Sequence, residues 1–81
     1  NYENNNIKIF PNPATSIINL INSNSNIKSI ELYDMQGRIL KTEKIDKTET
    51  QIDISNYQVG TYLIKVTTNY ITIFRKFIKN W

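Results

Sequence analysis

The chain has 81 residues and a net charge of +3, a length that predicts a single domain. It contains no cysteine and no histidine, which excludes disulfides, thiol catalysis and thiolate metal sites and removes the commonest general base and metal ligand. No run of residues approaches the roughly 18 apolar positions that a membrane-spanning helix needs.

The positive charge is concentrated late in the sequence. After Asp53 no acidic side chain follows, whereas Lys65, Arg75, Lys76 and Lys79 do. Such asymmetry can mark a nucleic-acid or membrane surface, and lysines on an exposed strand can also guard a sheet edge against pairing. Because the charges are single rather than clustered in a block, we favour a solvated strand face and predict no nucleic-acid partner.

The first 13 residues predict a linker, a strand and a corner. Residues 1–6 are polar and are expected to be a linker or frayed end in a piece of a longer protein. Residues 7–10 alternate in polarity and predict a short strand. Pro11-Asn12-Pro13 should end this strand in a stiff corner that carries the chain from one sheet edge to the next, because each proline removes a backbone donor and holds its predecessor extended.

Two further runs, residues 15–21 and 27–33, predict the second and third strands. Their inward side chains are expected to be Ile18, Leu20, Ile30 and Leu32. A hairpin turn should follow at Asp34 and Gly37, because Asp can hydrogen-bond the backbone two residues on and Gly accepts a positive φ.

The second half of the chain predicts four more strands. They are expected at residues 38–44, 51–54, 60–68 and 70–79, with a polar loop at 46–49. The last two are rich in β-branched and aromatic residues and should form a hairpin that turns at Asn69, since Asn tolerates left-handed backbone angles. We expect the strand at 60–68 to lie in the middle of a sheet. The sequence does not decide which face of the last strand is buried, since Ile71, Ile73 and Phe77 compete with Phe74 and Ile78 for the inward positions.

Seven short strands with turn signals roughly every 8 to 12 residues predict an all-β, immunoglobulin-like β-sandwich of antiparallel strands rather than a barrel. Gly60-x-Tyr62 is typical of a tyrosine corner, in which the tyrosine hydroxyl returns to the backbone a few residues upstream. The loop around Tyr57 and Gln58 lies at the right distance for that bond.

The sequence offers little material for catalysis. Its serines have no histidine to activate them, and it contains no Asp-x-Asp-x-Asp calcium loop and no glycine-rich phosphate loop. A Ser-Lys pair or two paired carboxylates stay open in principle, but turn and strand positions explain Asp34 and Asp53 better. We therefore predict no enzyme activity, no cofactor and no metal.

Binding is harder to exclude from the sequence. If two or three aromatic side chains aligned on one exposed face, they could stack on sugars, as in a carbohydrate-binding module of a secreted enzyme. The candidates are Tyr2, Phe10, Tyr33, Tyr57, Tyr70, Phe74, Phe77 and Trp81. A fibronectin-like spacer would share the predicted fold, so the fold alone does not separate these alternatives.

Four motifs in order resemble a known family. They are the segments at 9–15 with Pro11-Asn12-Pro13, at 30–38 with Asp34 and Gly37, at 59–66 with Gly60 and Tyr62, and at 75–79 with Lys76. Together they resemble the C-terminal sorting domain of the type IX secretion system, type A. The resemblance runs from about residue 7 to residue 79. Val59 departs from the small residue that is frequent before the glycine, and Asn80-Trp81 extends past the usual basic end.

The resemblance implies a non-catalytic signal domain, here residues 7–81, that directs an N-terminal cargo through the type IX system to the cell surface or medium of a Bacteroidetes-type bacterium. It implies transit by way of the periplasm and the outer membrane, with translocon components and a sortase-like peptidase as partners. Cleavage would then fall in residues 1–6. We expect recognition through the last strand and its exposed edge, with Lys76 as a contact, and a dimer through an exposed edge strand stays open.

Overall fold

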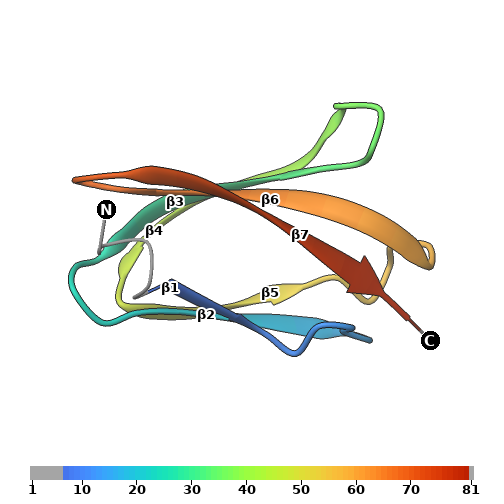
Figure 1. Cartoon of the computed structure of the whole chain (residues 1–81), viewed down its shortest axis with the longest axis horizontal. Helices are drawn as coiled ribbons and strands as arrows, with labels where there is room; N and C mark the ends of the chain where they lie inside the picture. The colour runs from blue at the N-terminus through green and yellow to red at the C-terminus, as the bar shows by residue number, and fades with distance from the viewer. Residues whose placement is uncertain (1–6, 81) are drawn as a thin grey trace.

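The computed structural model describes residues 7–80, which form seven β-strands (Figure 1). The strands are β1 (Ile7–Phe10), β2 (Ile17–Asn22), β3 (Ile27–Tyr33), β4 (Ile39–Lys47), β5 (Glu49–Asp53), β6 (Gly60–Thr68) and β7 (Thr72–Lys79). Among these residues no helix is long and apolar enough to cross a membrane. The linker expected at residues 1–6 lies outside the described part of the chain.

The strands form two antiparallel sheets that pack face to face (Figure 1). One sheet has the order β1-β2-β5 and the other β4-β3-β6-β7. The predicted all-β, immunoglobulin-like sandwich is therefore confirmed. The prediction that residues 60–68 lie in the middle of a sheet is also confirmed, because β6 pairs with β3 on one side and with β7 on the other.

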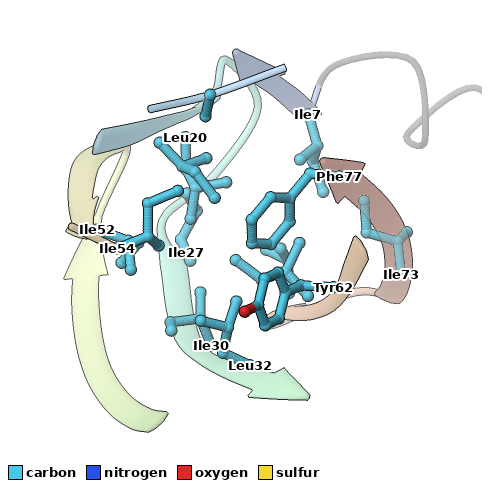
Figure 2. Packing of buried hydrophobic residues seen from close by; sticks show 14 residues of the cluster. Ile7, Leu20, Ile27, Ile30, Leu32, Ile52, Ile54, Tyr62, Ile73 and Phe77 are labelled. Carbon is cyan, nitrogen blue, oxygen red and sulfur yellow. The ribbon is translucent and has the colours of Figure 1, made fainter. Parts of the chain in front are cut away.

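The core fills the space between the two sheets (Figure 2). All four side chains expected to point inward are fully buried: Ile18, Leu20, Ile30 and Leu32. On β7 the structure decides the open question, since Ile73 and Phe77 are buried whereas Phe74 and Ile78 are exposed. Alternation along a strand sends successive side chains to opposite faces, so burying Phe77 places Phe74 and Ile78 on the outer face of the sheet.

Three aromatic rings pack in series at one end of this core. The ring of Tyr62 lies 5.6 Å from that of Phe77 and 5.7 Å from that of Tyr57, measured between ring centroids. The Tyr62 hydroxyl donates a 2.6 Å hydrogen bond to the backbone carbonyl of Gln58. The tyrosine corner is therefore confirmed at the expected loop. A hydrogen bond of this kind contributes about 1 kcal/mol and holds the β5–β6 connection against the core.

The polar loop predicted at residues 46–49 is wrong. β4 continues to Lys47 and β5 begins at Glu49, so the chain passes from one sheet to the other almost without a loop. Asp46 makes this possible by adopting a φ of 72°, an angle that Asp tolerates better than most residues. Its carboxylate accepts from Lys28 Nζ at 2.8 Å and from Asn26 Nδ2 at 3.0 Å. Hydrogen bonds from Lys28 and Asn26 thus hold Asp46 within β4, where composition alone predicted a loop.

The β6–β7 turn lies where it was expected but works by a different device. Asn69 does not have a positive φ. Instead the hydroxyl oxygen of Thr68 accepts from the backbone N–H groups of Tyr70 and Ile71, at 3.0 and 3.1 Å. The N–H of Thr68 donates to the carbonyl of Ile71 at 2.9 Å. Because the turn uses these residues, β7 begins at Thr72, two residues later than predicted.

Candidate functional site: the motif end of the sandwich

Three connections lie at the end of the sandwich where β7 finishes. They are residues 11–16 between β1 and β2, 34–38 between β3 and β4, and 54–59 between β5 and β6. Ala14 forms a parallel bridge with Lys79, so the first connection of one sheet touches the last strand of the other. We call this the motif end; it lies at the right in Figure 1. Ile7, where β1 begins, lies at the opposite end, one strand length away.

The sequence-predicted site residues converge on the motif end. Three of the motifs lie in the connections or open the strand that leaves them: Pro11-Asn12-Pro13, the Asp34 and Gly37 turn, and Gly60 and Tyr62 of β6. Gly60 pairs with Lys79, and Lys76 lies three residues before the end of β7. Segments that are far apart in the sequence thus share one end of the molecule, because antiparallel strands return their connections to the same side.

The Pro-Asn-Pro segment caps the outer edge of β7. The Asn12 side chain accepts from Ile78 N at 3.0 Å through Oδ1 and donates to Lys76 O at 3.4 Å through Nδ2. Next to it, Ala14 N donates to Ile78 O at 2.8 Å, and Asn80 N donates to Ala14 O at 2.7 Å. The side-chain amide of Asn12 acts as a peptide group would in a neighbouring strand. We call residues 11–14 the edge cap.

The edge cap changes what β7 can offer to a partner. The sequence predicts an exposed edge for the last strand, but the half of that edge from Lys76 onward is occupied by the cap. Upstream of Lys76, no backbone-to-backbone hydrogen bond from outside β6 reaches β7 in the described residues. Exposed strand edges tend to pair with other chains because their N–H and C=O groups lack hydrogen-bond partners. The edge cap therefore withdraws the second half of the β7 edge from pairing with a partner strand.

The β3–β4 turn has the mechanism that its sequence predicted. Asp34 Oδ1 accepts from Gln36 N at 2.9 Å and Arg38 N at 3.0 Å, and Oδ2 accepts from Arg38 Nε at 2.7 Å. Gly37 has a φ of 89°, which L side chains rarely adopt. Burial acts to raise the pKa of Asp34, but the hydrogen bonds from Arg38 and Gln36 prevail and lower it.

This turn predicts a pH dependence of stability. A carboxyl whose pKa is lower in the folded state than in the unfolded chain stabilises the fold above the unfolded pKa, about 3.9 for Asp, and loses that effect as pH falls through the folded value. We expect the free energy of unfolding to fall on acidification below about pH 4. Asp34→Asn should show a smaller fall, measured by urea denaturation at several pH values.

Other carboxyl groups also contribute to the loss of stability at low pH. The test is therefore the difference in pH dependence of the unfolding free energy between the wild-type protein and Asp34→Asn. The pKa values of Glu31, Asp46 and Asp53 are also lowered, chiefly by hydrogen bonds from Tyr33, Lys28 and Ser55 respectively. Asp53→Asn makes the same chemical change in a different turn and should also reduce the fall in stability, because the pKa of Asp53 is lowered too. If Asp34→Asn kept the full pH dependence of the wild-type protein, the turn would not be held by its ionised carboxylate.

The outer face of β7 carries a row of exposed side chains, which we call the outer row: Phe74, Lys76 and Ile78. Phe74 is 53% and Ile78 43% exposed, so both present apolar area to solvent. Leu63 of β6 lies opposite Lys76. A hollow of about 350 Å³ between Phe74, Leu63 and the Met35 region of the β3–β4 turn adjoins the row. The outer row is therefore an apolar surface with a positive charge at its centre.

The charges around the outer row are not all equivalent. On β6, Lys65 lies 3.6 Å from Glu31 Oε1, and the same carboxylate accepts a hydrogen bond from the Tyr33 hydroxyl. Lys65 is thus largely neutralised within the sheet. No ion pair to Lys76 is present among the described residues. Of the two lysines on this part of the face, Lys76 is the one whose charge remains available to a partner.

The described residues provide no assembled metal site. They contain no group of three His, Cys, Asp or Glu side chains placed to hold a metal ion. Of the aromatic side chains considered for a carbohydrate-binding platform, Phe77 is buried, Tyr57 packs on Tyr62, and Phe10 and Phe74 lie on different sheets. Tyr33 and Phe74 line one hollow, and Tyr70 is exposed in the β6–β7 turn. Tyr2 and Trp81 lie outside the described part of the chain. The arrangement at the motif end favours recognition of its shape and surface.

Two residues of this site were missed by sequence reasoning. Ala14 and Asn80 complete the edge cap through their backbones, and no property of their side chains signals that role. The small side chain of Ala14 was the available clue in the sequence, since a small residue after Pro-x-Pro permits close approach of two backbones, and the structure shows it fully buried. Residue type alone does not distinguish that approach from an ordinary loop.

The comparisons with known proteins agree with this geometry. The family model described as the secretion system C-terminal sorting domain matches residues 8–80. No curated protein sequence matches the chain. Among solved structures, one of PorZ, described as an essential bacterial surface component of the type-IX secretion system of Porphyromonas gingivalis, superposes with a TM-score of 0.73 at 16% identity. The match covers 99% of this chain and 12% of the PorZ chain.

At that identity the PorZ likeness establishes the sandwich fold, whereas the family model spans all four sequence motifs and both sheets. The chain therefore belongs to the secretion system C-terminal sorting domains, the signals that direct proteins to export by the type IX secretion system.

Proposed function

We propose that the export machinery reads this domain at its motif end, through the outer row of β7 and the surface beside the edge cap. The domain acts as a signal without catalytic activity, and the machinery recognises it by its shape and its charge. In this proposal Lys76 makes the central contact. Pro11, Asn12, Pro13, Asp34, Gly37, Gly60 and Tyr62 shape the surface around it. The coarse function, a sorting signal for type IX secretion to the cell surface or medium, follows from the family.

The observation that carries the proposal is the placement of the motif end. The motif residues lie at one end of the sandwich, and Ile7 lies at the opposite end. A cargo would join at the Ile7 end. A partner can therefore approach the motif end without meeting the cargo. The outer row adds exposed apolar area next to an unpaired lysine, which suits an apolar partner surface with an acidic group.

The route and processing belong to the same proposal. The cargo crosses the inner membrane, the folded domain is read in the periplasm by translocon components, and the cargo then passes the outer membrane. A sortase-like peptidase cleaves within residues 1–6, the polar segment before the first strand. Support comes from the sequence of that segment, since exposed polar segments are preferred sites of proteolysis. Mass spectrometry of the exported cargo would locate the new C-terminus.

A charge reversal at Lys76 tests the proposal. Full-length cargo carrying the domain with Lys76→Glu should appear in the medium or at the surface at least about tenfold less than wild type, because reversing one charge in a contact costs on the order of 1.4 kcal/mol or more. Secretion is measured by immunoblot of the medium and cell fractions. The fold should persist, since Lys76 is exposed.

Lys44→Glu is the matched control, because it makes the same charge change at an exposed lysine on β4 of the same sheet. It should be secreted normally. Equal secretion of Lys76→Glu and wild type would refute recognition through the outer row, while the family assignment would stand.

A further inference from the structure

A second surface at the motif end is built differently from the outer row. A hollow of about 710 Å³ opens between the β1–β2 and β5–β6 connections, with Lys79 at its wall. Ser16 and Ser55 contribute hydroxyl groups to it, and Tyr57 and Val59 contribute apolar area. Val59 is 50% exposed, so its side chain is available to an incoming group. The hollow thus combines an apolar wall with polar side chains and one cation.

Lys79 is buried to an unusual degree for a lysine. The residue is only 6% exposed, whereas lysines are almost never so buried unless they are paired. Its Nζ donates to the backbone carbonyl of Asn80 at 3.0 Å. No ion pair to Lys79 is present in the described part of the chain.

The described residues supply no counter-charge to Lys79. An ammonium group has three donors, and the described residues satisfy one of them with a neutral acceptor. Beyond Asp53 the sequence contains no acidic side chain, and Asp53 itself accepts from Ser55. Burying a cation without a counter-charge is costly. The position is therefore suited to an acidic group that arrives from another molecule.

We propose that this hollow binds a carboxylate of a partner polypeptide, with an apolar side chain beside it. The carboxylate would accept from Lys79 Nζ and from the hydroxyl group of Ser16, and the apolar side chain would lie against Tyr57 and Val59. The inner side of β7 carries Lys79, whereas the outer row lies on its other face. The site is thus distinct from the surface assigned to Lys76, and its existence does not depend on the secretion proposal.

Probe binding tests the inference on the intact 81-residue chain. The ¹⁵N-labelled protein is titrated with N-acetyl-phenylalanine and, separately, with N-acetyl-phenylalanine amide at equal ionic strength. The free acid should shift the backbone amide signals of Ser16, Ser55 and Lys79 in a saturable manner. The amide, which lacks the charge, should shift them at least about tenfold more weakly, since a hydrogen bond to a charged group is worth about one decade of affinity.

A second pair of probes distinguishes a chain end from an acidic side chain as the source. N-acetyl-Phe-Glu amide carries its carboxylate only on the side chain, and N-acetyl-Phe-Gln amide is its neutral match. Saturable shifts from either acid, or from both, support the site and identify the source. The inference is overturned if each acid behaves like its neutral partner.

Variants locate the binding charge. Lys79→Met keeps an unbranched apolar stem and should bind the acid probe at least about tenfold more weakly, and Lys79→Arg should retain binding. Lys44→Met removes an exposed lysine on β4 and should behave as wild type. Unchanged binding by Lys79→Met would overturn the inference. If Lys79→Met fails to fold, the comparison of acid with amide on the wild-type chain still decides.

Discussion

Phe77→Ala should remove much of the stability of this domain. Phe77 is fully buried and its ring packs against Tyr62, and truncation of a buried phenylalanine costs about 3–5 kcal/mol. A domain of this kind has a total stability of about 5–15 kcal/mol, with small domains at the low end. Since each kcal/mol shifts Tm by roughly 4–8 °C at this size, we expect Tm to fall by at least about 12 °C. Thermal unfolding followed by circular dichroism measures the change.

The neighbouring residue provides a matched control for that prediction. Ile78 follows Phe77 on the same strand but points outward and is 43% exposed. Ile78→Ala leaves the backbone contacts of the edge cap in place and should cost less than about 1 kcal/mol, as surface substitutions usually do. If the two variants lost similar stability, the assignment of faces on β7 would be wrong.

Deleting residues 75–81 from a full-length cargo should abolish its export and leave it in the periplasm. The deletion removes the outer row beyond Phe74. It also removes Phe77 from the core and the partner strand of the edge cap. Both the recognised surface and the fold that presents it are therefore lost. Fractionation of the cells, with immunoblotting of medium and periplasm, measures the outcome.

The deletion removes both the recognised surface and part of the core. It is therefore compared with variants that change only one of the two. Lys76→Glu alters the surface alone, and Phe77→Ala alters the core alone. Loss of export in all three would assign roles to both the surface and the fold. Loss in Phe77→Ala and the deletion only would leave folding as the sole requirement. Normal export of the truncated cargo would contradict the role of β7 in sorting altogether.

Local sequence patterns were sufficient to predict the structure where residues close together in the sequence decide it. The alternation of residues 27–33 placed Ile30 and Leu32 in the core, and the Asp34 to Gly37 turn forms through bonds within four residues. The tyrosine corner spans four residues, from Tyr62 to Gln58. At residues 46–49 composition failed, because partners on β3, about 18 residues away, hold Asp46 in a strand.

The sequence by itself determined the all-β class, the central position of β6 and the family, since alternation, turn chemistry and motif order are local properties of the chain. Only the tertiary structure decided which face of β7 is buried, that Asn12 caps its edge, and that Lys79 lines a hollow. The physical reason lies in distance along the chain. Asn12 reaches Lys76 and Ile78 across 64 and 66 positions, and no local propensity encodes a hydrogen bond that exists only once two sheets have packed.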